Sequence, residues 1–570
     1  MKYLKKYIAP ALWILKITKR SKRDFGYLIA LSLISSGIEI LCFTILRQFL
    51  SISTFEISSD SATISLRNTS LQLAFSYSIR LIVLLLINYG IFRYASEVLN
   101  DLRNHLIELS LTKSPHSPNN LGSTVIINTI QNASINSVNV FIIALAKSLT
   151  EVLVAMVIIL YLLYSDFAFT FFTIIALSIT GALLYGPVKN LSLKYGNRSL
   201  RANEKTLEIL TDTQSSLSTI KTFGSLWSFK EYFMMYSRTY SSVGVYEKLL
   251  RSLPRPLFES ILISGIAFSV TIITYFKSHN LSIIAGLGLM AAAGLRLIPT
   301  INIISSFLQS FNFNYSSFER VTQLSAACAE RNNNQIDNKQ TIALDLTYSF
   351  SIQFDDFVLK SGKKLFPDHP LVLKRGQLNT IIGPSGCGKS SILEAIVGLS
   401  SNSSQPKVKI DDVQISLLEV ESFRKNIAYC PQKVELIHGN IIDNIILDPL
   451  VSVQLSDSQD AAKFDFDRLY KCMDDVELLS QLGDDGVYTH LSPLNPPLSG
   501  GQLQRLALAR AIFHRKNIIV LDELTSGLDP STENKIIDLL TKLSKNYFIV
   551  MATHSKEVIR NSRVCYSFNY

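Results

Sequence analysis

A glycine-rich segment of the chain has the residue types and spacing of a phosphate-binding loop. The sequence Gly-Pro-Ser-Gly-Cys-Gly-Lys-Ser covers residues 383–390, directly after the apolar run 378–382 and before a predicted helix. Glycines allow successive backbone N–H groups to turn towards phosphate oxygens, and the N-terminus of the helix adds the positive end of its dipole. The Lys389 ammonium group can reach terminal phosphates, and the Ser390 hydroxyl can bind Mg²⁺. The predicted phosphate-binding residues are Gly383, Pro384, Ser385, Gly386, Cys387, Gly388, Lys389, Ser390 and Ser391.

Two further polar clusters argue against a chance glycine-rich turn. The apolar run 518–521 ends in Asp522 and Glu523, of which the first suits Mg²⁺ organisation and the second suits polarising an attacking water. Between the two phosphate-site motifs, Ser-Gly-Gly at 499–501 precedes a predicted helix over 503–513, and a helix start of this kind is a second anion cradle. A chain with one nucleotide needs a second cradle only if that cradle completes the site of a partner.

Six short segments, taken in order, resemble the ABC ATPase domain. They are GPSGCGKS, YCPQ, LSGGQ, IIVLDE, SGLD and ATH. The resemblance implies ATP as the nucleotide with Mg²⁺ as its metal, and it implies a working dimer. It assigns catalysis to Glu523, His554 and Gln432, and metal contacts to Ser390, Gln432 and Asp522. It places Ser499, Gly500 and Gly501 opposite the γ-phosphate across the dimer. It also counts Gln502 and the D-loop aspartate Asp529 among the nucleotide-binding residues.

Three positions depart from the pattern of that family. Lys360 or Ser361 stands where an adenine-stacking aromatic is usual, and Phe357 comes three or four positions early, so the stacking residue stays unassigned. Gly527 replaces an alanine in the D-loop, and the segment 493–497, Pro-Leu-Asn-Pro-Pro, replaces a glycine-rich turn. We therefore expect the coupling between the ATPase domain and its partner domain to differ in detail from that of the family.

The composition predicts that this ATPase domain is joined to a membrane domain. The 570 residues are 48% hydrophobic and only 18% charged, whereas soluble domains average about 25% charged. The net charge of +10 admits two readings: nucleic-acid binding, or Lys and Arg flanking membrane spans on the cytoplasmic side. The apolar stretches favour the second reading, so no nucleic-acid partner is expected. The scattered cysteines, without any CxxC pair, fit a reducing cytosol around the C-terminal half.

Apolar stretches of about 20 residues, enough to cross a bilayer, predict about six spans. They lie at roughly 25–50, 77–99, 138–164, 166–188, 256–277 and 282–310. Two long polar stretches near 100–137 and 189–255 share one side with the basic N-terminus, and the positive-inside rule makes that side cytoplasmic. The predicted outer loop between the first two spans is 51–75. We expect an integral protein of a bacterial inner membrane with its ATPase domain in the cytoplasm.

The expected fold class is an α-helical six-span transmembrane domain fused to an α/β P-loop ATPase domain. The predicted divisions are a cytoplasmic elbow region at 1–24, a transmembrane domain with two long cytoplasmic loops at 25–320, a linker at 321–342 and the nucleotide-binding domain at 343–570. This order is similar to ABC exporter half-transporters, which implies a second half-transporter as partner, and a homodimer is sufficient.

Charged residues inside predicted spans are costly in lipid and are therefore candidates for substrate binding. Arg296, Arg80 and Arg93 outnumber the acids of their own spans, and arginine suits phosphate bidentately. The alternative is helix packing through ion pairs, which we favour for the remaining intramembrane charges Lys147, Glu151, Glu39 and Glu259.

The segment 293–314, with the N-terminal spans, looks similar to bacterial flippases of lipid-linked oligosaccharides and to related polysaccharide and lipid exporters. That likeness implies ATP-driven export or flipping of an amphiphile, such as a lipid-linked oligosaccharide or another anionic lipid. A multidrug or peptide exporter, and an importer or nucleotide-gated channel on the exporter scaffold, remain alternatives. A soluble ABC protein acting on translation or DNA is disfavoured by the spans.

Overall fold

The computed structural model separates the chain into two compact units, which meet in sequence near residue 330. A helical unit comes first, and an α/β unit follows it. The structure describes residues 2–18, 26, 34–42, 44–46, 48–49, 52, 60–112, 122–165, 167–275, 281–332, 346, 349–355, 357–358, 364–365, 371–399, 407–411, 413–415, 423–448, 465–482, 485–493 and 496–568.

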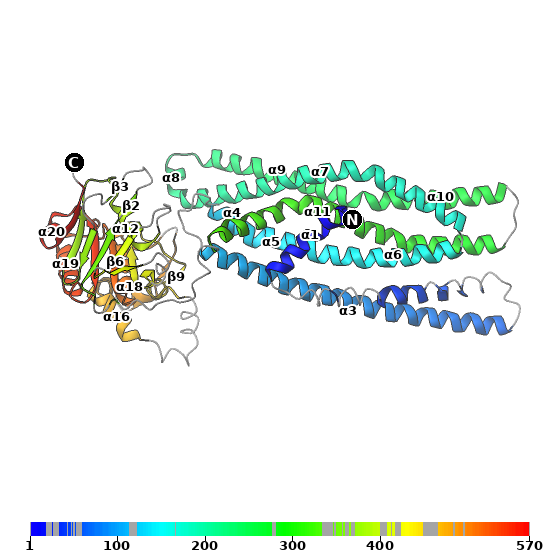
Figure 1. Ribbon diagram of the computed structural model, residues 1–570. Coiled ribbons are helices and arrows are strands. Elements are labelled where there is room, and N and C mark those ends of the chain that lie inside the picture. Colours follow the sequence, from blue (N-terminus) through cyan, green and yellow to red (C-terminus); the bar gives the residue numbers. More distant parts are fainter. Residues whose placement is uncertain are drawn as a thin grey trace. The chain divides into compact units, whose positions relative to one another are not determined.

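The helical unit is built from long helices that run along one another (Figure 1). Its elements are α1 (Lys2–Ile17), a helical segment over 34–42, α3 (Asp60–Thr112), α4 (Ser123–Asn128), η1 (Thr129–Ala133), α5 (Ser134–Val138), η2 (Asn139–Ala144), α6 (Leu145–Ser165), α7 (Phe167–Ser215), α8 (Leu217–Thr222), α9 (Leu226–Ser252), α10 (Pro254–Tyr275) and α11 (Leu281–Asn332).

The predicted loops of this unit are largely helical, which corrects the sequence-based boundaries. Helix α3 begins at Asp60, inside the predicted outer loop 51–75. The polar stretch 189–255 continues α7 to Ser215 and then forms α8 and α9. A loss of apolar residues marks where a helix leaves an apolar environment, and the backbone hydrogen bonds of the helix continue regardless of that change. The predicted linker 321–342 is helical as far as Asn332, and 333–342 lies outside the described residues.

Two described helical stretches are long and apolar enough to cross a membrane. They are Ile64–Leu111 and Ser123–Tyr161, which contain 18-residue segments with mean hydropathies of 1.9 and 2.2. The expected count of six spans stays a prediction.

The elbow segment predicted at the N-terminus is helix α1, and it packs into the core of the helical unit. Ile14 and Leu15 are buried against side chains of α3 and η2. Trp13 meets Phe318 of α11 edge-on at 5.4 Å, and Phe141 meets Phe311 at 5.2 Å. Aromatic pairs of this kind stabilise a core beyond their buried area.

The α/β unit is organised by a five-stranded parallel sheet of order β13-β5-β12-β11-β8. Its strands are β5 (Leu378–Ile382), β8 (Ile427–Cys430), β11 (Ile518–Asp522), β12 (Phe548–Thr553) and β13 (Arg563–Ser567). Strands β11 and β12 are buried throughout, as continuous apolar runs in a covered parallel sheet should be. Ile382 pairs with Thr553, and Asp522 pairs with Ala552, so the carboxyl ends of β5, β11 and β12 meet at one edge.

A second, antiparallel sheet has the order β4-β1-β6-β7. Its strands are β1 (Ser351–Asp355), β4 (Leu371–Lys374), β6 (Lys407–Ile410) and β7 (Val413–Ile415). The other elements are β2 (Phe357–Val358), β3 (Lys364–Leu365), α12 (Lys389–Val397), β9 (Gly439–Asn440), α14 (Ile441–Ile446), α16 (Phe466–Asp475), α17 (Leu479–Leu482), η5 (Asp485–Tyr488), β10 (His490–Leu491), α18 (Gly500–Phe513), α19 (Pro530–Leu543) and α20 (Lys556–Arg560).

Candidate functional site

The predicted phosphate loop lies between β5 and α12, in the strand–loop–helix setting that the motif requires. Gly386 and Gly388 have φ values of +79° and +112°, a region that side-chain-bearing residues rarely adopt. A Cβ atom on Gly383 would lie 2.8 Å from Cys387 Sγ and 2.9 Å from Phe568 Cβ, so no larger residue fits there without movement. The backbone N–H groups can therefore line a concave loop at the start of α12.

Lys389 is folded back onto the loop that precedes it. Its side chain is 5% exposed, and Nζ donates to the carbonyl oxygens of Gly383 at 2.9 Å and Pro384 at 3.1 Å. Glu523 Oε1 lies 3.7 Å away. Neutral carbonyls are weaker partners for an ammonium group than phosphate oxygens. The lysine is thus held where a terminal phosphate would replace them as acceptor.

Two residues with predicted catalytic roles contact the carboxylate of a third. Gln432 Nε2 donates to Glu523 Oε2 at 2.8 Å, and His554 Nδ1 lies 3.5 Å from Glu523 Oε1. Glu523 has a φ of +50°, and its N–H donates to the Ala552 carbonyl, so the backbone turns sharply where β11 ends. Left-handed backbone at a non-glycine residue is often found at functional sites. The arrangement directs the Glu523 carboxylate towards the phosphate loop.

Asp522 and Ser390 fit a Mg²⁺ ion. Asp522 is 4% exposed, and its Oδ1 atom has no hydrogen-bond partner among the described residues. Burial, and to a lesser degree the neighbouring Glu523 carboxylate, raise the pKa of Asp522, whereas a hydrogen bond with Ser390 opposes this shift. Mg²⁺ prefers carboxylate and hydroxyl oxygens and keeps several waters and phosphate oxygens. A buried carboxylate oxygen beside a serine hydroxyl suits that chemistry.

The signature segment 499–502 caps α18. Gln502 N–H donates to Ser499 Oγ at 3.3 Å, and Ser499 N–H donates to Gln502 Oε1 at 2.8 Å, a reciprocal capping box. A Cβ atom on Gly500 would meet no atom within 4 Å, whereas one on Gly501 would lie 3.0 Å from the Gly527 carbonyl oxygen. The start of α18 is therefore open at Gly500 and closely packed at Gly501.

Gln504, which sequence reasoning missed, holds the D-loop. Its Nε2 donates to Ser526 Oγ at 3.2 Å, and its Oε1 accepts from Gly527 N–H at 3.2 Å. A Cβ atom on Gly527 would lie 3.1 Å from Gln504 Oε1, so glycine relieves crowding where the family has alanine. The only sequence signal was a polar residue two positions after the signature motif.

The predicted D-loop aspartate, Asp529, is the N-cap of α19. Its carboxylate accepts from the Ser531 hydroxyl and from Thr532 N–H. These hydrogen bonds hold the pKa of Asp529 well below its ordinary value. The side chain is thus engaged within its own loop, and its nucleotide-binding role stays a prediction.

The base-stacking position is the part of the site that lies outside the described residues, because both Lys360 and Ser361 belong to that portion of the chain. A cavity of about 700 Å³ adjoins the phosphate loop and is lined by Gly383, Ser385, Glu523, His554 and Phe568, among others. This volume lies within the range of about 300–1,000 Å³ for small-molecule sites. Phe568 is an aromatic of this site that the sequence did not single out.

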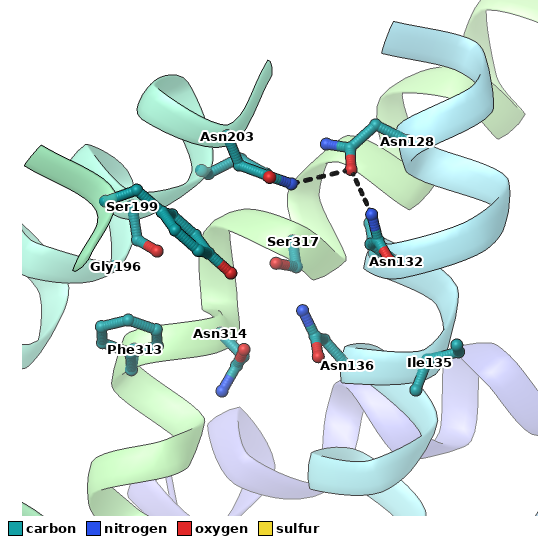
Figure 2. A pocket seen from close by; sticks show the side chains of 13 residues that line it. Asn128, Asn132, Ile135, Asn136, Gly196, Ser199, Asn203, Phe313, Asn314 and Ser317 are labelled. Carbon is teal, nitrogen blue, oxygen red and sulfur yellow. Dashed lines mark hydrogen bonds between the residues drawn. The ribbon is translucent and has the colours of Figure 1, made fainter. Parts of the chain in front are cut away.

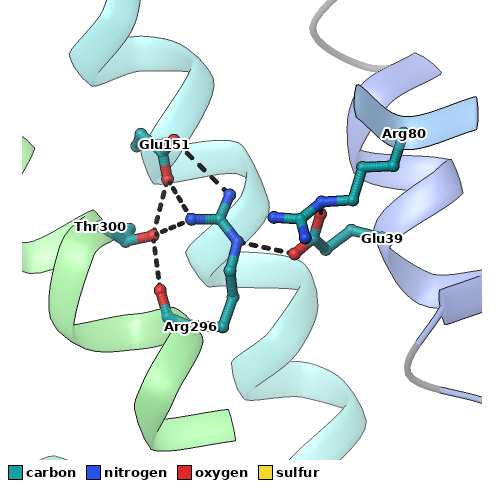
Figure 3. Close-up of polar contacts among 5 residues, drawn as sticks. All are labelled: Glu39, Arg80, Glu151, Arg296 and Thr300. Carbon is teal, nitrogen blue, oxygen red and sulfur yellow. Dashed lines mark hydrogen bonds and ion pairs between the residues drawn. The ribbon is translucent and has the colours of Figure 1, made fainter. Parts of the chain in front are cut away.

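The predicted substrate arginines were expected to lack acidic partners in their own spans, and two of them find partners on other helices. Arg80 Nε lies 2.6 Å from Glu39 Oε2, and Arg296 Nε lies 2.6 Å from Glu39 Oε1 (Figure 3). Arg296 also lies 3.2 Å from Glu151, which accepts from the Thr300 hydroxyl at 2.6 Å. The cluster joins the 34–42 segment, α3, α6 and α11, and its two guanidinium groups balance two carboxylates.

Arg93 does not join this charge cluster. It pairs with Glu97 on its own helix at 3.4 Å, and its side chain is 68% exposed. Of the other intramembrane charges, Lys147 lies over the Phe92 ring at 4.5 Å, and Glu259 pairs with Arg255 at 2.7 Å. The expected pairing of Lys147 with an acid is therefore replaced by a cation–π contact, while Glu151 and Glu39 pair with arginines.

The fold and the site define a class of protein in which a P-loop ATPase unit follows a bundle of long helices along the chain. Residues 368–526 match the ABC transporter family, so this segment is an ABC transporter ATPase domain, which uses ATP with Mg²⁺. The whole chain has the fold of a bacterial Atm1-family ABC exporter with ATP bound, with a TM-score of 0.74 at 16% identity over 95% of this chain and 92% of that one.

Two curated relatives are similar over part of the chain. One is the glutathione/L-cysteine transport system ATP-binding/permease protein CydC of Escherichia coli, 32% identical over 32% of this chain and 30% of its own length. The other is the ABC multidrug transporter MDR2 of Trichophyton rubrum, 33% identical over 35% of this chain. The chain thus spans about a third of the first relative and 14% of the second.

Proposed function

We propose that this protein is a half-transporter of the ABC exporter type, which couples ATP hydrolysis to the movement of an amphiphilic substrate across a membrane. The observation that carries the proposal is the meeting of Lys389, Glu523, Gln432 and His554 at the carboxyl edge of the parallel sheet. The exporter fold of the whole chain supports the coupling to a helical membrane domain.

Within the ATP site, each side chain has a definable task. Lys389 binds the terminal phosphates, and Glu523 accepts a hydrogen bond from the attacking water and polarises it. Gln432 and His554 hold the Glu523 carboxylate in place from both of its oxygens. Ser390 and Asp522 would hold Mg²⁺, which when bound neutralises charge that develops on the phosphates.

We propose further that two chains share each ATP site. The open start of α18 at Gly500 offers free backbone N–H groups and a helix dipole, which suit a γ-phosphate. Nothing in the chain's own ATP site needs this second cradle. A homodimer supplies it twice, because each chain has both a hydrolytic glutamate and a signature segment.

For the cargo, the proposed class is a lipid-linked oligosaccharide or another anionic lipid. The charge cluster of Figure 3 does not recruit an anionic headgroup by excess charge, because its arginines are neutralised by Glu39 and Glu151. We therefore assign Arg80 and Arg296 mainly a structural role, in which they join helices. They could bind a headgroup only if their ion pairs with Glu39 and Glu151 opened. The proposed location is a bacterial inner membrane, with the ATPase domain in the cytoplasm.

Transport of a fluorescent polyprenyl-diphosphate oligosaccharide in proteoliposomes tests this function. ATP with Mg²⁺ should drive its movement between leaflets in the wild type and not in Glu523→Gln, while Glu557→Gln, an exposed acid of α20, serves as the matched control. Equal movement with and without ATP would overturn the proposal of active transport. ATP-driven movement of a drug-like dye and none of the glycolipid would leave transport in place and replace the cargo.

A further inference from the structure

A cleft in the helical unit is lined by carboxamide and hydroxyl groups (Figure 2). Asn128, Asn132 and Asn136 recur every four residues along the stretch Ser123–Tyr161. That stretch contains two π-helical segments, η1 and η2, which begin directly after Asn128 and at Asn139. π-helical segments are rare in proteins as a whole, and those that occur are often found at functional sites. One side of this helix therefore presents three carboxamides in a row to the cleft.

The opposite wall is formed where α7 and α11 touch. A Cβ atom on Gly196 of α7 would lie 2.0 Å from the carbonyl oxygen of Phe313 on α11, so only glycine permits this approach. Ser199, Asn203 and Ser317 line the space beside the contact. Its volume is about 210 Å³, several times the ~30 Å³ that one water occupies in the liquid.

Some polar groups of the cleft are held in place and others are free to bind. Asn128 is 2% exposed, and its Oδ1 accepts from Asn132 at 2.8 Å and from Asn203 at 3.0 Å. Asn136, an exposed residue, and Ser317, which is 6% exposed as a whole residue, also line the cavity, and the side chain of neither is hydrogen-bonded among the described residues. Polar side chains that face a cavity without protein partners can exchange water for a hydrogen-bonding ligand.

The cleft continues into a second cavity of about 700 Å³ that carries charge. The two cavities share Asn136, Ser199, Tyr240, Phe313 and Asn314. Beyond these, the second cavity is lined by the α9 residues Glu247, Lys248 and Arg251. Arg251 donates to Glu247 at 2.5 Å, which leaves one more cation than acid at this end. The continuous cleft is thus neutral and polar at one end and positive at the other.

We infer that this cleft binds the glycosyl part of an anionic glycoconjugate. Carboxamides donate and accept at once, as sugar hydroxyls do, and no charged side chain lines the first cavity. The rings of Tyr240 and Phe313 offer apolar faces for the C–H face of a sugar ring, and Lys248 and Arg251 suit the adjoining anionic group. A purely apolar cargo would leave Asn136 and Ser317 unpaired on binding.

This inference rests on the proposed function and deepens it, because it assigns the polar part of the cargo to a cleft between α5, α7, α9 and α11. The charge cluster at Glu39 plays no part in it. The cargo's anionic group meets the α9 cations, whose charge is not fully neutralised, and this recognition is independent of Arg80 and Arg296.

Binding titrations of the full-length protein in lipid nanodiscs, without nucleotide, test the cleft. The probes are farnesyl-diphospho-N-acetylglucosamine, farnesyl diphosphate as the same lipid without sugar, and N-acetylglucosamine 1-phosphate as the same sugar without lipid. The variants are Asn136→Leu and Ser317→Ala, and the matched control is Asn197→Leu, an exposed asparagine of α7 outside both cavities.

We expect Asn136→Leu and Ser317→Ala each to raise the Kd of both sugar-bearing probes about five- to tenfold and to leave farnesyl diphosphate binding unchanged. Asn197→Leu should match the wild type, and Lys248→Gln should weaken all three anionic probes. Equal Kd values in all variants, or no sugar-dependent binding at all, would overturn the inference and leave a water-filled cleft. Because no ATP is present, these outcomes are separate from a failure of ATP-driven transport, which Glu523→Gln tests.

Discussion

The two groups of buried charges in this protein are built in opposite ways. At the ATP site, the Lys389 ammonium group donates to two neutral backbone carbonyls and lies 3.7 Å from a Glu523 oxygen, and Asp522 keeps a buried oxygen without a hydrogen-bond partner among the described residues. In the helical unit, Arg80 and Arg296 are paired with Glu39 and Glu151 at 2.6–3.2 Å (Figure 3). Buried charges without full partners are costly and await a ligand, whereas paired charges hold structure.

This contrast indicates which charged residues mark a binding site. A charged residue in an apolar segment signals either a ligand or a partner, and only its neighbours in space decide between the two. The first group supports a site for Mg²⁺ and triphosphate. The second group supports a link between four helical segments. Variants of the two groups should therefore fail in different assays, one in turnover and the other in stability.

The largest effect is expected for a charge placed at the open start of α18. Gly500→Asp adds a side chain where no other described part of the chain lies within 4 Å of the new Cβ, so we expect little disturbance within the chain itself and attribute a loss of activity to the dimer. A carboxylate facing a partner's γ-phosphate should lower ATP turnover by at least about 10²-fold while nucleotide binding persists. Gly500→Asn has the same size without the charge and should retain most turnover. Equal activity of the two variants would argue against the shared site.

Next in size is the opening of the charge cluster. Glu39→Gln leaves two guanidinium groups without their common partner and should destabilise the helical unit by about 3–5 kcal/mol, as removal of one partner of a buried pair does. Thermal unfolding in detergent measures this effect. Glu259→Gln breaks an exposed i,i+4 pair with Arg255 and should lower the stability far less. Similar melting temperatures for both variants would contradict a structural role for the cluster.

The contact of α7 with α11 gives a smaller effect on stability. Gly196→Ala would push a methyl group to 2.0 Å from the Phe313 carbonyl oxygen, so the helices must separate, at about 1–3 kcal/mol. Gly244→Ala, on α9, meets no atom within 4 Å and should be neutral or stabilising by about 0.5–1 kcal/mol. Reversed signs of these two changes in thermal unfolding would show that α7 and α11 do not touch there in solution.

The smallest effect concerns nucleotide choice. Without an aromatic at Lys360 or Ser361, adenine loses a stacking contact of about 1–3 kcal/mol, so the KM for ATP should be high and GTP turnover should lie within a few-fold of ATP turnover. Steady-state kinetics with both nucleotides measure the ratio. Strict selectivity for ATP that is lost in Phe357→Ala would instead assign stacking to Phe357.

The ATPase half could be predicted from sequence far more completely than the helical half. Motif spacing located Lys389, Gln432, Glu523 and His554, and the structure brings them together because parallel strands end at one edge of the sheet. Gln504 was missed because its role depends on a neighbour 23 residues away, Gly527, whose backbone it binds.

In the helical half, long apolar stretches predicted membrane-spanning helices but neither the ends of those helices nor their partners. Arg296 and Glu39 are 257 residues apart, and nothing in the local pattern of either one indicates the other. The asparagines 128, 132 and 136 stand at helical spacing in the sequence, yet their importance appears only when α7 and α11 close the cleft around them.

The hydrolytic role of Glu523 is tested by measuring ATP hydrolysis in the reconstituted full-length wild type, Glu523→Gln and Glu557→Gln. We expect Mg²⁺-dependent turnover in the wild type and in Glu557→Gln. Glu523→Gln should lose at least about 10²-fold in turnover, still bind ATP and accumulate as a closed dimer. Near-normal hydrolysis by Glu523→Gln would contradict the assignment of the site, and with it the contrast between the two groups of charges.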